Sequence, residues 1–110
     1  MNRSLPVTVR EFVEGHFDTV TDVEVLLLLH REPKRTWTSG AVARRLRIHT
    51  QQTEDILDGL QQMGLVRRRE DTFEYAPGTE EVASAVEMLA AVYSRYRFRI
   101  SSLIFSKCRP

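Results

Sequence analysis

Arginine is the residue type in this sequence with the clearest capacity for chemistry, and the chemistry it predicts is phosphate binding. The arginines of interest fall into two groups: Arg44, Arg45 and Arg47, then Arg67, Arg68 and Arg69. Nucleic-acid affinity depends on neutralising backbone phosphates with Lys and Arg, so both groups are candidate contacts. Gln51, Gln52 and Glu54 lie between them and suit base edges, because Gln can bond adenine and a carboxylate can accept from cytosine N4.

The other reactive side chains form no recognisable constellation. His16, His30 and His49 lack metal-ligand spacing, and Cys108 is the only cysteine. The sequence has no glycine-rich phosphate loop, nucleophile motif or carboxylate pair typical of acid–base catalysis. We therefore expect a protein that is not an enzyme and that needs no metal or cofactor.

The composition is that of an ordinary single domain. The chain has 110 residues and a net charge of +1, so its total charge does not by itself indicate a nucleic-acid partner. Residues 1–10 contain no apolar signal segment, and the longest apolar run, Val25 to Leu29, is too short to span a bilayer. We expect a cytoplasmic protein, for which membrane attachment is a minor alternative.

Hydrophobic spacing predicts two helices in the first third of the chain. An amphipathic stripe over residues 9–17 indicates the first. The second is apolar on nearly all sides, which is typical of a buried helix. We expect Asp18 or Thr21 to cap it and Pro33 to end it.

Two shorter helices and a hairpin follow. Thr38 or Ser39 is expected to cap a helix over 40–46, and Thr50 to cap the next one. Gly64 suits the left-handed position that ends that helix. Residues 65–69 and 73–76 then read as two strands of a hairpin.

A long helix is predicted from Glu80 to about Phe105. Its apolar residues are spaced alternately by four and three, as in a coiled-coil seam: Val82, Val86, Leu89, Tyr93, Tyr96, Ile100 and Leu103. One helix of this length is about 39 Å long at ~1.5 Å per residue. We therefore expect its end to project beyond the domain, and the seam to be exposed and to pair with a second copy in a homodimer.

The segment from Thr38 to Tyr75 carries a family resemblance. It reads TSGAVARRLRIHTQQTEDILDGLQQMGLVRRREDTFEY, with a helix end, then Gly-Leu-Val, then a basic strand. This is similar to winged helix-turn-helix regulators of the multiple-antibiotic-resistance-regulator and PadR-like kinds. The resemblance implies a mainly α fold with a small β-hairpin wing and a long C-terminal helix. It divides the chain into 1–79, the winged domain with its N-terminal helix, and 80–110, a helix for dimerisation or partner binding with a basic tail.

The resemblance also implies a function. A DNA-binding transcriptional regulator of this kind would place the helix from Thr50 to Met63 in the major groove of double-stranded DNA. Gln51, Gln52 and Glu54 would face bases, and the two arginine groups would face phosphates. Dimers in these families form through terminal helices.

The charges of the expected reading helix favour an alternative. The helix has no Lys or Arg but carries Glu54, Asp55 and Asp58, and the hairpin tip is Glu70 and Asp71. These carboxylates would repel phosphate. The arginines could instead form a solvated surface paired with Glu54, Asp55 and Glu70. The fold would then serve as a protein-interaction or assembly module that does not bind DNA.

The C-terminal segment has a second interpretation. Arg95, Arg97 and Arg99 alternate with apolar residues, and nothing from residue 95 to 109 is acidic. A basic amphipathic helix can bind an acidic partner, another protein or a membrane surface. The favoured interpretation is a dimer seam flanked by solvated arginines.

Overall fold

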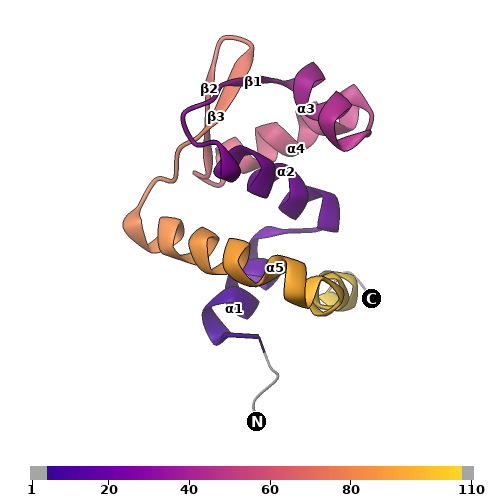
Figure 1. The fold of residues 1–110 in the computed structure, drawn as a ribbon, viewed down its shortest axis with the longest axis vertical. Coiled ribbons are helices and arrows are strands. Elements are labelled where there is room, and N and C mark those ends of the chain that lie inside the picture. The colour runs from indigo at the N-terminus through magenta and orange to yellow at the C-terminus, as the bar shows by residue number, and fades with distance from the viewer. Residues whose placement is uncertain (1–4, 108–110) are drawn as a thin grey trace.

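The computed structural model describes residues 5–107 (Figure 1). Over this range the chain is mainly α, with a β-hairpin after the first four helices, a short strand between the second and third helices that completes a small antiparallel sheet, and a long helix at the C-terminal end. The elements are α1 Val7–His16, α2 Val20–Arg31, β1 Trp37–Thr38, α3 Ser39–Leu46, α4 Thr50–Gln62, β2 Val66–Arg69, β3 Thr72–Tyr75 and α5 Glu80–Lys107. This order is consistent with a winged-helix-like topology.

Two of the predicted helix ends are confirmed. The Thr38 hydroxyl accepts a hydrogen bond from the Ala41 N–H at 3.1 Å and so caps α3. After α4, Gly64 has φ +78°, and the Leu65 N–H donates to the Leu60 carbonyl at 3.0 Å. This pair of features is the Schellman ending that glycine makes accessible, because other residues are strained at positive φ.

Two predicted caps are wrong. Thr19, not Asp18 or Thr21, caps α2, where it forms a reciprocal capping box with Asp22: the Thr19 hydroxyl accepts from the Asp22 N–H, and the Asp22 carboxylate accepts from the Thr19 N–H. Thr50 is the first residue of α4 rather than its cap. The residue before α4 is His49, whose side chain makes no capping bond.

The sheet has one more strand than the sequence predicted. Its order is β1-β3-β2, with Trp37 opposite Phe73 and Arg67 opposite Glu74. The extra strand, β1, is only two residues long, which is too short for an alternating pattern to reveal it. The predicted hairpin is present as β2 and β3.

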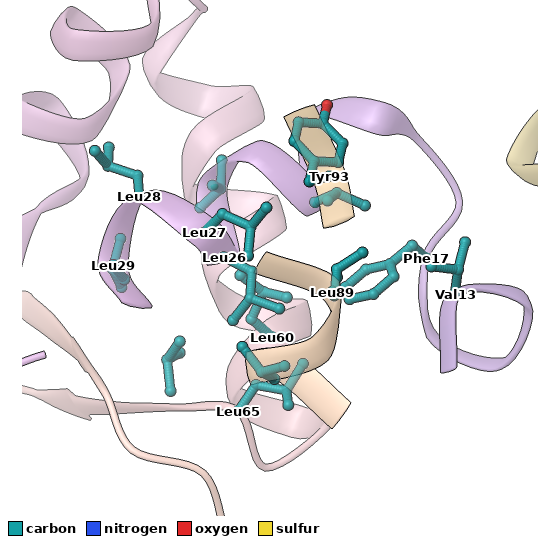
Figure 2. Close-up of a cluster of buried hydrophobic side chains, with 14 of the residues drawn as sticks. Val13, Phe17, Leu26, Leu27, Leu28, Leu29, Leu60, Leu65, Leu89 and Tyr93 are labelled. Atoms are coloured by element: carbon teal, nitrogen blue, oxygen red, sulfur yellow. The ribbon is translucent and has the colours of Figure 1, made fainter. Parts of the chain in front are cut away.

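The core is built around α2, as its all-round apolar sequence predicted. All six of its apolar positions from Val23 to Leu29 are buried, with Glu24 the one exception in that run. Figure 2 shows leucines of α2 gathered with Leu60 near the end of α4 and Leu89 on α5. Each such side chain contributes about 1.5–3 kcal/mol of burial free energy. The helix therefore ties the α3–α4 region to α5.

The predicted exposed seam on α5 is not present as such. Val86, Leu89, Tyr93 and Ile100 are buried within the chain itself, while Val82, Tyr96 and Leu103 are half-buried. The face that carries them packs on α1 and α2. The same alternation of four and three arises whenever a helix packs on neighbours in its own domain, so the spacing alone does not indicate a second chain.

The long helix also bends. Tyr96 has non-helical backbone angles, φ −116° and ψ 28°, and the helix changes direction there, as its yellow end in Figure 1 shows. Beyond the bend, Ile100 and Ile104 are buried and the helix lies along α1. The predicted straight projection beyond the domain is therefore wrong, because the second half of α5 turns to cover α1.

Candidate nucleic-acid interface

The turn between α3 and α4 is set by an arginine in an uncommon conformation. Arg47 has φ 61° and ψ 49°, the left-handed region, and its N–H donates to the Ala43 carbonyl. The Ile48 N–H donates to the same carbonyl at 3.0 Å. A left-handed residue other than glycine costs about 1–2 kcal/mol. The turn thus holds an exposed cationic side chain where a glycine would relieve strain.

The start of α4 is open and electropositive. Its first turn has no acidic residue, and no side chain caps it. The free N–H groups of a helix start carry a partial positive charge that attracts anions. Arg44 and Arg47 on the preceding segment are exposed and form no ion pair within residues 5–107. The helix start and the two arginines therefore place positive charge at this end of α4.

The predicted base-facing residues are exposed on α4, but two of them have partners. Glu54 accepts a hydrogen bond from the Ser39 hydroxyl at 3.2 Å, and the Gln51 amide donates to Asp55 at 3.2 Å. Gln52 has no such bond among the described residues. Both carboxylates lie in the second turn of the helix, so the acidic part of α4 begins one turn after its open end.

Two of the three hairpin arginines are bonded within the hairpin region. Arg67 donates through Nε and Nη2 to one oxygen of Glu74, at 3.2 and 2.7 Å. This bond and the charges of Arg67 and Arg69 lower the pKa of Glu74 below its ordinary value of 4.5. Arg68 lies 3.6 Å from an Asp58 oxygen and donates to the Glu70 carbonyl at 2.8 Å.

These pairings differ from those the sequence suggested. Glu54, Asp55 and Glu70 were the expected carboxylate partners, whereas the structure uses Glu74 and Asp58. The strand register provides the reason, since a two-residue turn at 70–71 places Arg67 directly opposite Glu74. Arg69 is the hairpin arginine without an ion pair in the part of the chain described here.

Arg45 lies in a different environment from its neighbours. It lines a pocket of about 300 Å³ between α2, the end of α3 and α5, together with Arg31 and Arg97. The arginines that the sequence grouped as one phosphate-facing set therefore occupy three settings: the open start of α4, this pocket and the paired hairpin.

An apolar surface on α1 and α5 was not foreseen. Three large side chains are mostly exposed there, Val7 at 64%, Phe98 at 83% and Phe105 at 72%. Beside them a groove of about 370 Å³ runs between the two helices, lined in part by Leu5, Phe98 and Leu103. We refer to Val7, Phe98, Leu103 and Phe105 as the α1–α5 apolar surface. The sequence signal for this surface was the spacing of Phe98 and Phe105, which are seven residues apart.

Two of the histidines contact groups within the chain, one in its own helix and one on another element. His16 Nδ1 lies 2.9 Å from the Phe12 carbonyl in its own helix. His30 Nε2 lies 3.0 Å from Glu87 on α5, and its ring meets Tyr75 edge-on. Residues 5–107 contain no group of three or more His, Cys, Asp or Glu side chains placed to hold a metal ion. Cys108 lies outside the described residues.

Within the same range, no helix is long and apolar enough to cross a membrane. Comparisons of the chain with known protein families, curated proteins and solved structures give no match.

Proposed function

We propose that this chain is a winged helix-turn-helix protein that binds double-stranded DNA as a dimer and acts as a transcriptional regulator. One observation carries the proposal: the uncapped, acid-free first turn of α4, flanked by exposed Arg44 and Arg47. A helix start of this kind binds phosphate oxygens through its N–H groups. The strained backbone of Arg47 supports the assignment, since strain of this type is often retained at functional positions.

In this proposal the start of α4 is the part of the chain that approaches DNA. Arg44 and Arg47 contact phosphates, Gln52 is free to reach a base edge, and Arg69 contacts the backbone from the hairpin. Glu54 and Asp55 face away from phosphate or accept from a base amino group. Because only a few arginines are available, binding is expected to be weak, and the slope of log affinity against log salt is expected to be shallow.

The experiment is a salt titration of DNA binding with matched variants. The double variant Arg44→Gln/Arg47→Gln removes the two exposed cations, and Arg10→Gln on α1 removes an exposed cation elsewhere. We expect the double variant to bind roughly tenfold more weakly and to lower the slope of log affinity against log salt by about 1.8 for each copy in contact with DNA, whereas Arg10→Gln should bind as the unmodified chain does. Equal losses in both variants would contradict a specific role for the start of α4.

The proposed dimer uses the α1–α5 apolar surface, with a second copy as the occupant. Exposed Glu11 lies on α1, while exposed Arg95 and Arg99 lie on α5. A two-fold axis brings the α1 of one copy against the α5 of the other, so the opposite charges complement each other around the phenylalanines. Burial of exposed Phe98 and Phe105 supplies the apolar contact.

A specific observation favours a second candidate, a protein-interaction module that does not bind DNA. Two hairpin arginines are neutralised by Glu74 and Asp58, and α4 presents further carboxylates in Glu54 and Asp55. A basic protein partner would suit this face. The same titration separates the candidates, because a module of this kind should show no DNA affinity even at low salt.

A further inference from the structure

A side-chain hydrogen bond joins α3 to α4 one turn after the start of α4. The Ser39 hydroxyl donates to Oε2 of Glu54 at 3.2 Å. Ser39 is the first residue of α3, and Thr38 already caps that helix through its own hydroxyl, so the Ser39 hydroxyl is not needed as a cap. The bond therefore links the two helices to each other rather than completing one of them.

Glu54 keeps acceptor positions that are accessible to solvent. Its side chain is exposed, and its other oxygen, Oε1, makes no hydrogen bond or ion pair among residues 5–107. An ionised carboxylate has about four acceptor positions, and the Ser39 bond uses one of them. The adjacent carboxylate of Asp55 is instead bonded to Gln51 in its own helix. Glu54 is thus held by a different helix while one of its oxygens remains available.

The chemistry of base edges limits what an exposed carboxylate can contact in a major groove. Guanine presents the acceptors O6 and N7 there, and thymine presents the acceptor O4, so each repels a carboxylate. The donors are the amino groups of adenine and cytosine. The adenine amino group lies beside the acceptor N7, whereas the cytosine amino group lies beside an apolar C5–H. A carboxylate is therefore matched best by cytosine N4.

We propose that Glu54 is a specificity-determining residue that accepts a hydrogen bond from cytosine N4, and that Ser39 is the residue that positions it. This inference rests on the proposed DNA binding by the start of α4 and adds to it a preference for a C·G pair opposite Glu54. The Ser39 bond restricts the rotamers of Glu54 before DNA binds, so less side-chain entropy is lost on binding. The second carboxylate oxygen contacts the base.

The test compares the binding of the full chain to two alternating duplexes, inosine·cytosine and adenine·thymine, by fluorescence anisotropy at low salt. Inosine lacks the N2 amino group of guanine, so the two duplexes present the same minor-groove pattern and differ in the major groove. The quantity measured is the ratio of the inosine·cytosine affinity to the adenine·thymine affinity. A change in phosphate attraction alters both affinities together and leaves this ratio unchanged.

We expect Glu54→Gln to lower the ratio by about fivefold for each copy in contact with DNA, because glutamine can bond adenine and the carboxylate acceptor is lost. Ser39→Ala should lower the ratio by about twofold, since the carboxylate is then no longer held. Ser39→Thr retains the hydroxyl and should keep the ratio of the unmodified chain. Asp55→Asn is the matched control, because it removes an exposed carboxylate one residue away and should leave the ratio unchanged.

The outcomes separate this inference from the proposed function. Binding to both duplexes with a ratio that Glu54→Gln does not change, or that Asp55→Asn changes equally, would overturn the role of Glu54 and leave the proposed DNA binding intact. A ratio unaffected by Ser39→Ala would overturn the positioning role of Ser39. No binding to either duplex at the lowest salt would overturn the proposed function and this inference with it.

Discussion

Arg67 and Glu74 lie directly opposite each other on the β2–β3 hairpin, with Nη2 2.7 Å from Oε2. This ion pair engages Arg67, which is one of the arginines that the family resemblance assigns to phosphate contacts. A bidentate donor held by one carboxylate presents little net charge to a third group. The hairpin of this chain is therefore less basic than its three consecutive arginines indicate.

Replacing Glu74 with Gln should increase DNA affinity. The change leaves Arg67 without its carboxylate, so the guanidinium is available to a phosphate, and the slope of log affinity against log salt should steepen by about 0.9 for each copy in contact with DNA. Fluorescence anisotropy on a short duplex measures both quantities. Glu81→Gln, at an exposed position on α5, has the same charge change and should have little effect. Equal effects of the two variants would mean that the hairpin does not approach DNA.

The same carboxylate predicts a pH dependence of stability. The pKa of Glu74 is lowered in the folded chain, chiefly by its hydrogen bond to Arg67. Its contribution is therefore present above the ordinary value of 4.5 and is lost as the pH falls through the lowered folded value. Urea unfolding of the unmodified chain and of Glu74→Gln should differ at neutral pH and converge in acid. A difference that persists unchanged in acid would contradict the pairing.

The environment of Tyr93 predicts that the stability of the fold decreases at alkaline pH. Burial, the charge of Glu24 and the hydrogen bond to Glu24 raise the pKa of Tyr93 to about 12, from 10.0. A raised folded pKa means that this contribution is complete below pH 10.0 and is lost as the pH rises towards about 12. Tyr93→Phe should lose less stability over that interval, as measured by urea unfolding. Absorbance titration should show a phenolate signal that forms only as the pH approaches about 12 and that is absent in Tyr93→Phe.

Arg47→Gly should separate stability from binding. Glycine relieves the left-handed strain at this position, so the free energy of unfolding should rise by up to about 1 kcal/mol. Loss of the guanidinium should at the same time weaken DNA binding. Thermal unfolding and anisotropy measure the two effects. A variant that is stabilised and binds DNA undiminished would remove Arg47 from the proposed interface.

Substitutions of exposed and of buried apolar residues on α5 should have different effects. The first kind should affect dimerisation, and the second should affect the stability of the fold. If the proposed dimer forms through the α1–α5 apolar surface, Phe98→Ser with Phe105→Ser should give a monomer in light scattering with little change in monomer stability, because both side chains are exposed. Leu89→Ala, in the stripe that the sequence identified as a dimer seam, should instead destabilise the fold by about 2–5 kcal/mol, because Leu89 is fully buried within the chain. A phenylalanine double variant that remains dimeric would place the interface elsewhere.

The fold was more predictable from the sequence than the site was. Features that depend on a few neighbouring residues were predicted correctly: the hairpin, the cap at Thr38 and the left-handed conformation of Gly64. The α5 stripe was misassigned because burial against α1 and burial against a second chain require the same spacing.

Partners of charged groups were harder to predict, since each depends on a register or a packing relationship that the sequence does not display. The Arg67–Glu74 pair follows only once the turn at 70–71 is fixed. The meeting of Arg31, Arg45 and Arg97 needs the positions of three helices. The bend at Tyr96, which brings the end of α5 onto α1, has no proline or glycine at that position to announce it.

Binding of DNA phosphate by the open start of α4 is tested most directly by fluorescence anisotropy of a random-sequence duplex with the full chain, titrated from low to physiological salt. We expect binding at low salt that weakens as salt rises, with a complex whose mass in light scattering contains two copies of the chain. No binding at the lowest salt would rule out the proposed DNA binding, because nonspecific phosphate affinity should appear there first, and would favour the protein-interaction module.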